Sequence, residues 1–175
     1  LFDPKPDLAK FAGQPLPGRT LKHPQGVSSL AVSADGRTAV TGCNDGKVRI
    51  WNVESATVEQ EIQGDAPQVV SLSHDGRRIV STDSASRLVR LIELETVRQF
   101  ALRNNRSLRL DEIAPLSGLA GRGYPIWCAK FSSDDQRLLT AAGDGAQLWD
   151  AAGGGTELQV FRPQGAVASV DFSPN

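Results

Sequence analysis

Histidine is the side chain best suited to proton transfer near neutral pH, and this sequence holds two of them, His23 and His74. Nucleophilic catalysis needs a base within hydrogen-bond reach of the nucleophile and a third group that orients the base. Two histidines that lie far apart in the sequence give poor support for such an arrangement. His74 precedes an Asp-Gly pair and is expected to be a solvated residue at a hairpin tip. We therefore predict no catalytic residue and no enzymatic activity.

Carboxylates and thiolates could bind a metal, but their spacing here does not favour one. Zinc sites need clustered Cys or His ligands, and calcium loops need a ladder of oxygen ligands, and neither pattern is present in the sequence. The aspartates instead recur at matching turn positions: Asp35, Asp45, Asp75, Asp134 and Asp144. We therefore expect no metal and no cofactor.

Composition excludes several classes of protein. With 39% hydrophobic and 22% charged residues, the chain has the make-up of a soluble globular domain, and its net charge of −1 gives no basic excess for nucleic acid. The apolar runs are far too short to cross a bilayer, so no membrane association is expected. Cys43 and Cys128 stand alone in separate apolar runs and are expected to be free thiols, which favours a reducing compartment such as the cytoplasm. Localisation is otherwise open.

The chain repeats itself. The run from Val27 to Gly36 recurs from Pro67 to Gly76, from Ile126 to Asp135, and again from Val167 to the end of the chain. Asp35 and Asp75 lie 40 positions apart and Ser132 and Ser173 lie 41 apart, so the period is about 40, interrupted by one insertion near residues 101–121.

Each unit has the pattern of a small antiparallel sheet. Short alternating runs are separated by turns, of which Asp-Gly is a strong hairpin signal because glycine accepts the positive φ that the turn needs. A fourth run is expected to close each unit: Thr57 to Gln63, Thr96 to Leu102, and Glu157 to Arg162. No segment keeps helical spacing of apolar residues for three turns, so the fold class is predicted to be all-β. Such small sheets must stack face to face to bury their surfaces.

These repeats resemble the WD-repeat family, whose units carry a histidine before the first strand, Ser-x-Asp-Gly in the first hairpin and Trp-Asp at the end of the third strand. The best copy reads His23, Ser33-Ala34-Asp35-Gly36, Asp45-Gly46 and Ile50-Trp51-Asn52; another reads Ser132-Ser133-Asp134-Asp135, Asp144-Gly145 and Leu148-Trp149-Asp150. The resemblance spans the whole chain, and the Ala-, Gly- and Arg-rich composition of the repeats is similar to that of bacterial members. It implies a β-propeller of four-stranded antiparallel blades, present here as an arc of about four blades' worth of a larger ring.

The resemblance also implies a structural hydrogen-bond network inside a blade, formed by a histidine, a Ser or Thr, an aspartate and a tryptophan. His23, Thr41, Asp45 and Trp51 match all four positions, so His23 is expected to be structural, with the carboxylate fixing its tautomer. In the last complete unit Thr140, Asp144 and Trp149 match, but Arg122 replaces the histidine. In the middle unit Ile92 replaces the tryptophan and Ala85 the aspartate, so that unit is expected to be the least rigid.

Both ends resemble parts of further blades. Leu1-Phe2-Asp3 is similar to the Leu-Trp-Asp that ends a third strand. We therefore expect the chain to be part of a longer protein, in which residues 1–22 end a preceding blade with its third-strand end and fourth strand. Three blades are expected at 23–63, 64–121 and 122–162, the middle one with the inserted loop at about 101–121, followed by the first strand of a further blade at 163–175.

The insertion is the place where a binding function is expected, because a long loop in a tight fold is uncommon and is often functional. Arg103, Arg106 and Arg109 recur every three residues within it, and a short helical turn would place them on one side. Such a cluster could bind acidic side chains or a phosphopeptide. The alternative is a solvated insertion that closes over the edge of the blade.

The functional prediction is a non-catalytic scaffold of WD-repeat type that binds a protein or peptide partner. The alternative is a sensor or regulatory propeller that is fused, outside this chain, to an enzymatic domain such as a protein kinase or protease. This inference is by analogy with the family, because fold alone does not fix function.

Overall fold

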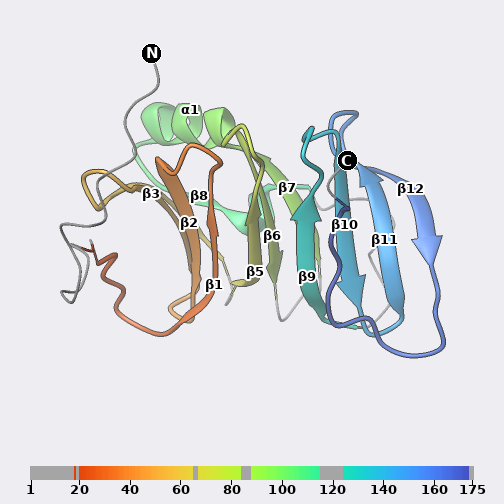
Figure 1. Ribbon diagram of the computed structural model, residues 1–175. Helices are drawn as coiled ribbons and strands as arrows, with labels where there is room; N and C mark the ends of the chain where they lie inside the picture. Colours follow the sequence, from red (N-terminus) through yellow and green to blue (C-terminus); the bar gives the residue numbers. More distant parts are fainter. Residues whose placement is uncertain (1–17, 19, 65–66, 84–87, 115–123, 174–175) are drawn as a thin grey trace, which may run out of the picture.

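The computed structural model describes residues 18, 20–64, 67–83, 88–114 and 124–173. It contains three antiparallel meanders that stand side by side in a row (Figure 1). Blade 1 comprises β1 (Val27–Val32), β2 (Thr38–Cys43), β3 (Lys47–Asn52) and β4 (Thr57–Gln63); blade 2 comprises β5 (Pro67–Leu72), β6 (Arg78–Asp83) and β7 (Val89–Glu93); blade 3 comprises β9 (Ile126–Phe131), β10 (Arg137–Ala142), β11 (Gly145–Asp150) and β12 (Thr156–Phe161). The predicted all-β arc of antiparallel blades is confirmed, and over the described ranges it does not close into a ring.

The first hairpin of every blade is built by the same local chemistry. Ser33 donates its hydroxyl to Asp35 at 2.6 Å, and Asp35 in turn accepts the backbone N–H of Arg37 at 3.0 Å. The same serine–aspartate bond recurs at Ser73–Asp75 and at Ser132–Asp134. These bonds hold the pKa of Asp35 below its usual value, so the carboxylate stays ionised as a turn-forming acceptor. The recurring aspartates of this hairpin therefore serve turn geometry.

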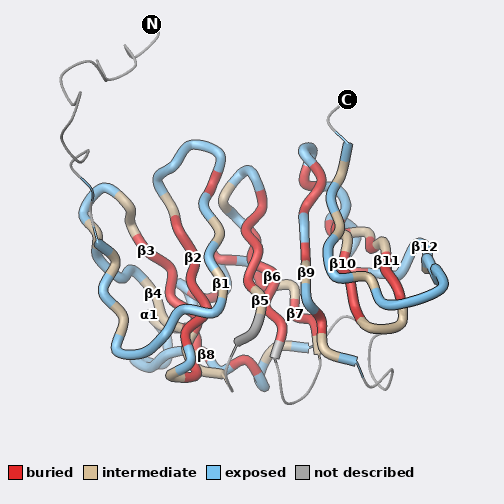
Figure 2. Tube along the Cα trace, turned by 60° about the horizontal axis from the view of Figure 1, so that its bottom comes forward, coloured by how far each residue is buried: buried red, intermediate tan, exposed pale blue. Residues whose placement is uncertain are grey.

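The blades are held together by apolar side chains that alternate between the two faces of each sheet. In β6, Ile79 packs toward blade 1 and Val80 toward blade 3, because successive residues of a strand point to opposite faces. Burial is concentrated in the inner strands of the row, and the exposed residues lie at loops and outer edges (Figure 2). Each fully buried aliphatic side chain contributes roughly 1.5–3 kcal/mol. Blade 2 is thus buried on both faces and joins the other two.

The expected fourth strand of blade 2, Thr96 to Leu102, is wrong, because these residues lie in helix α1 (Leu94–Asn104). Leu94 and Val97 are three residues apart and both are buried, which fits a helix that packs one face on the core and does not fit alternation along a strand. Asn105 ends the helix in the left-handed region at φ 50°, with its N–H donated to the carbonyl of Ala101. Over the described part of the chain, no helix is long and apolar enough to cross a membrane.

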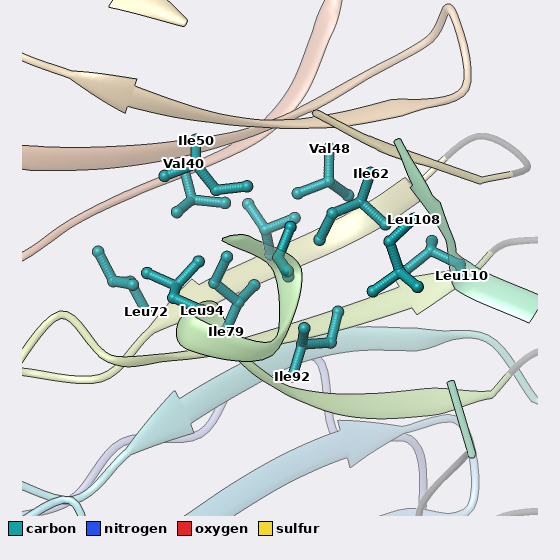
Figure 3. Packing of buried hydrophobic residues seen from close by; sticks show 12 residues of the cluster. Val40, Val48, Ile50, Ile62, Leu72, Ile79, Ile92, Leu94, Leu108 and Leu110 are labelled. Atoms are coloured by element: carbon teal, nitrogen blue, oxygen red, sulfur yellow. The ribbon is translucent and has the colours of Figure 1, made fainter. Parts of the chain in front are cut away.

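The chain that leaves α1 does not add a strand to the sheet of blade 2. It forms β8 (Leu108–Arg109), which pairs in parallel with the outer strand of blade 1 through Ile62 and Leu108. Blade 1 therefore has five strands in the order β1-β2-β3-β4-β8, whereas the sheet of blade 2 has three. Leu108 and Leu110 point into the same cluster as Ile62 (Figure 3). A side chain at Gly64 would collide with Leu110, so this close approach requires glycine.

The remaining expectations concern the two ends of the chain. Most of the expected end of a preceding blade, residues 1–17 and 19, lies outside the described residues. The strand expected at 163–175 is not formed over residues 163–173. Val167 donates one backbone hydrogen bond to Ala142, but a strand requires a ladder of such bonds with a neighbour. Cys43 is buried and Cys128 is partly buried, and both are free thiols.

Candidate functional site

In blade 1, three of the four network residues meet at the hydroxyl of Thr41. The indole Nε1 of Trp51 donates to Thr41 Oγ1 at 2.9 Å, and His23 Nε2 lies 2.8 Å from the same oxygen. His23 Nδ1 lies 2.9 Å from the carbonyl of Leu21, and because a carbonyl only accepts, Nδ1 must carry the proton. Nε2 then accepts from the Thr41 hydroxyl. Both ring nitrogens of His23 are thus engaged within the blade.

The fourth residue, Asp45, does not orient the histidine as the resemblance implied. Its carboxylate forms a two-pronged ion pair with Arg49, at 2.5 and 3.2 Å. Arg49 is 5% exposed, and a buried guanidinium needs carboxylates, of which Glu61 supplies a second at 2.9 Å. The hydrogen bond from Arg49 lowers the pKa of Asp45 to about 2. The tautomer of His23 is fixed by the Leu21 carbonyl instead.

Blade 3 repeats the central pair of the network. Trp149 Nε1 donates to Thr140 Oγ1 at 3.0 Å, and both side chains are fully buried. Asp144 lies in the turn between β10 and β11. Arg122 lies outside the described residues. The pair of hydroxyl acceptor and indole donor therefore recurs in the two blades that keep the tryptophan.

Blade 2 shows what remains when the tryptophan is lost. Ile92 pairs with Ile79 as Trp51 pairs with Ala39 in blade 1, so Ile92 occupies the tryptophan position. Ser81 occupies the position of Thr41, and it is 1% exposed. Its hydroxyl finds no hydrogen-bond partner among the residues that the structure describes. Ala85 lies outside the described residues.

A contact between repeats that the sequence did not indicate is centred on Asp135. Its carboxylate accepts the backbone N–H groups of His74 and Asp75 in blade 2, at 2.7 and 2.8 Å. His74 is a half-exposed hairpin residue whose ring Nδ1 also lies 3.2 Å from Asp135. Asp135 has φ 58°, in the place where the other two hairpins have Gly36 and Gly76. An aspartate in the left-handed region thus joins two blades.

Arg78 completes this joint from the side of blade 2. Its guanidinium donates to the carbonyls of Ala151 and Asp135 in blade 3, and it lies 5.8 Å from the centre of the Phe131 ring. The guanidinium thus caps backbone oxygens that would otherwise be buried without a donor. Arg78 and Asp135 are both less than one-tenth exposed, so the joint is part of the packed interior.

The three arginines of the insertion lie in three different local structures. Arg103 is in the last turn of α1, Arg106 follows the helix, and Arg109 is in β8, so no single helical turn places the three on one side. The physical reason is that Asn105 turns the chain through the left-handed region between Arg103 and Arg106.

Two of these arginines are neutralised within the insertion itself. Arg106 binds Glu112 through two hydrogen bonds of 2.6 and 3.0 Å, and Arg109 binds Asp111 at 3.0 Å. The hydrogen bond from Arg106 lowers the pKa of Glu112 to about 2. The Arg106 guanidinium also lies over the ring of Phe100, 4.7 Å from its centre.

The outer face of α1 carries a small hollow of about 190 Å³, lined by Thr96, Gln99, Phe100, Arg103 and Asn104. A second hollow, of about 640 Å³, lies between β1, β5 and β9, the first strands of the three blades. Leu30, Val32 and Trp127 line it and are 58%, 51% and 40% exposed. Among the described residues, no three His, Cys, Asp or Glu side chains are grouped as a metal site would require. Both hollows are therefore candidate surfaces for a partner.

Comparison with known proteins identifies the repeats. Residues 16–52 and 114–150 match the family model described as WD domain, G-beta repeat. Both segments end on a third strand that carries the tryptophan, Trp51 in β3 and Trp149 in β11. WD40 repeats are thus supported in blades 1 and 3, the two blades that retain the indole–hydroxyl pair.

Relatives and solved structures extend this comparison. A probable E3 ubiquitin ligase complex SCF subunit sconB from Penicillium rubens is 33% identical over 58 residues, which is 31% of this chain and 9% of that protein. The structure of U3-55K and the crystal structure of RRP9 WD40 repeats both superpose with a TM-score of 0.67, at 18% and 19% identity. Each covers 86% of this chain, which spans 44% and 43% of theirs. The bacterial character expected from the composition of the repeats is not borne out, because the sconB relative is eukaryotic.

Proposed function

We propose that this chain belongs to a non-catalytic scaffold that binds protein partners and that α1 with the chain that follows it, residues 94–114, is a docking element. WD40 repeats are typical of protein-interaction scaffolds. The sconB relative is named as a subunit of a ubiquitin ligase complex, which fits a role in assembling proteins. Because the chain spans less than half of the solved structures that it matches, the activity of the whole protein is part of this proposal.

Residues 94–114 carry the proposal because they are anchored in the core at both ends and have an exposed outer face. Leu94 and Val97 anchor the helix in the core between blades 1 and 2, and Leu108 anchors the segment that follows. The residues between these anchors, 101–107, are exposed or partly exposed, and Leu102 is 85% exposed. A helix that is held on a rigid scaffold loses little conformational entropy when a partner binds. The segment is therefore suited to recognition.

The histidines support a non-catalytic role. A general base must offer an accessible lone pair to its substrate. The two ring nitrogens of His23 face Thr41 and Leu21 inside blade 1. In His74, Nδ1 faces Asp135 at the joint between blades 2 and 3. Each histidine thus has a structural contact that explains its presence.

Native capture with the full-length parent protein tests the proposal. Proteins captured by the wild type would be identified and purified. The binding of each purified partner would then be measured for the wild type and for the triple variant R103A/R106A/R109A, whose folding is first checked by thermal melting. Loss of a purified partner in a folded triple variant supports docking on the insertion. A partner retained by that variant would place binding elsewhere, for example at the hollow between β1, β5 and β9. Absence of any protein that binds again in purified form would overturn the scaffold function.

A further inference from the structure

The outer face of α1 has the elements of a small recognition site. Thr96, Gln99, Phe100, Arg103 and Asn104 follow the spacing i, i+3, i+4, i+7 and i+8, so they share one face of the helix. They surround the hollow of about 190 Å³, which is large enough for one side chain of a partner. Phe100 is half-buried and supplies an aromatic wall that the core holds from beneath. The face can therefore accept an apolar side chain.

Charge at this face is concentrated on one residue. Arg106 and Arg109 have carboxylates of their own segment, Glu112 and Asp111. Arg103 lines the hollow and is exposed, and within the described ranges it forms no ion pair. Its guanidinium is thus available to a carboxylate from outside. Recognition of a phosphopeptide uses several arginines at once, whereas a single guanidinium fork matches one carboxylate.

The stacked arginine shapes the same site. The guanidinium of Arg106 lies over the Phe100 ring while Glu112 compensates its charge. The ring is therefore held between the core and a neutralised ion pair, which fixes one wall of the hollow without adding net charge. Glu95, the single carboxylate within α1, accepts a hydrogen bond from Gln99. The positive end of the site is consequently Arg103.

We propose that this face binds an acidic peptide segment of a protein partner, with an aliphatic side chain in the hollow and an Asp or Glu carboxylate on Arg103. The proposal rests on the proposed scaffold function and names the chemistry of its partner. Arg103 is the recognition residue, and Arg106 and Arg109 act in the structure of the insertion.

The test is selection of peptides from a displayed random library on the full-length parent protein, followed by fluorescence anisotropy with the enriched peptides. Enrichment of an aliphatic residue close to Asp or Glu is expected. R103A is expected to weaken the selected peptide by about tenfold or more, because the charge-assisted hydrogen bonds from its guanidinium to the carboxylate are lost. T96W, which fills the hollow without removing a core side chain, is expected to weaken it similarly. R109A is the matched control and is expected to keep the affinity, and thermal melting verifies each variant.

Several outcomes would overturn this assignment. One is an equal loss in R109A and R103A; another is tighter binding when the glutamate of the peptide is replaced by phosphoserine, which would point to an arginine cluster. No selected peptide, or peptides without acidic residues, would also reject it. If natural partners captured by the parent protein still bind R103A and T96W, this docking site fails while the scaffold function stands. If no protein partner is captured at all, both fail.

Discussion

The carboxylate of Asp135 in blade 3 accepts the backbone N–H of His74 in blade 2 at 2.7 Å, across the boundary between two repeats. The same carboxylate accepts the N–H of Asp75 at 2.8 Å. A helical or turn carboxylate normally serves its own backbone, but here it serves the neighbouring repeat. Asp135 therefore couples two blades at the position where blades 1 and 2 have only a glycine, Gly36 or Gly76.

Replacing Asp135 with the glycine of the other repeats should show whether its hydrogen bonds outweigh the strain of its left-handed backbone. D135G relieves the left-handed conformation, which costs a non-glycine residue about 1 kcal/mol, but it removes two charge-assisted hydrogen bonds worth about 1.5–3 kcal/mol each. We expect a net loss of about 2–5 kcal/mol in the free energy of unfolding, measured with urea. D135N, which tolerates the same φ, is expected to lose about half as much. E54Q, at an exposed turn, is the control; a D135G protein as stable as E54Q would contradict the joint.

The buried hydroxyl of Ser81 should be dispensable. Because it has no partner among the described residues, S81A is expected to leave the free energy of unfolding unchanged or to raise it by up to about 1 kcal/mol. T140V at the equivalent position of blade 3 should lower it by about 1–3 kcal/mol, since the buried Trp149 N–H would lose its acceptor. Chemical denaturation of both variants makes the comparison. A loss above about 1 kcal/mol in S81A would show that the hydroxyl has a partner.

Thr41 should matter more than Thr140, because its hydroxyl serves two groups. T41V would leave both Trp51 Nε1 and His23 Nε2 without their partner. We expect it to cost about 1 kcal/mol more than T140V. Nitrogen NMR shifts of His23 in the wild type should report a proton on Nδ1, and T41S should preserve that signal. A proton on Nε2 in the wild type would refute the hydrogen-bond order assigned here.

Acid should weaken blade 1 in a defined pH range. The pKa of Asp45 is lowered from 3.8 to about 2 by its hydrogen bond with Arg49. A lowered folded-state pKa adds stability that is fully present above the ordinary value and is lost as the pH falls through the folded value. The free energy of unfolding should therefore drop between about pH 4 and pH 2, by on the order of 1–2 kcal/mol from this group. In D45N this contribution should be missing, with lower stability at neutral pH; an unchanged pH profile would contradict it.

The ion pair of the insertion can be checked directly by NMR titration. The pKa of Glu112 is about 2 because Arg106 donates two hydrogen bonds to its carboxylate. In R106A it should rise toward the ordinary value of 4.5 but stay somewhat below, since the N–H of Arg109 still donates to Glu112. R103A should not change it. A low pKa of Glu112 in R106A would mean that another group neutralises it.

Periodicity is what made the fold predictable. The Ser-x-Asp hairpin and the apolar alternation are local signals, and each repeat supports the others, so the strands of blades 1 and 3 could be assigned from the sequence. Thr41 and Trp51 were identified through the resemblance to WD repeats, and their hydrogen bond follows the rule that a buried indole N–H has an acceptor. These features depend on residues that are close in the sequence or equivalent in the repeat.

What could not be predicted depends on contacts between elements. Helix α1 spans only three turns, and its buried face consists of Leu94, Val97 and part of Phe100, a pattern too short to outweigh the repeat that predicted a strand. The partner of Asp45 is Arg49, a buried arginine in the next strand. The sequence signal for this pair was the charge of Arg49 in the middle of an apolar run. Asp135 looked like an ordinary turn residue, because the N–H groups that donate to its carboxylate lie in another blade.

The parallel pairing of β8 with β4 sets an order in which parts of the protein can fold during translation. Residues Leu108 and Arg109 leave the ribosome well after Ile62 and Gln63, with all of blade 2 synthesised in between. Blade 1 can form its four-stranded meander early, but its outer edge is completed only when the chain beyond α1 has emerged. Closure of this long loop makes the last step slow relative to the local hairpins. During translation, blades 1 and 2 therefore mature as a single unit, and the edge of β4 stays open until that unit is finished.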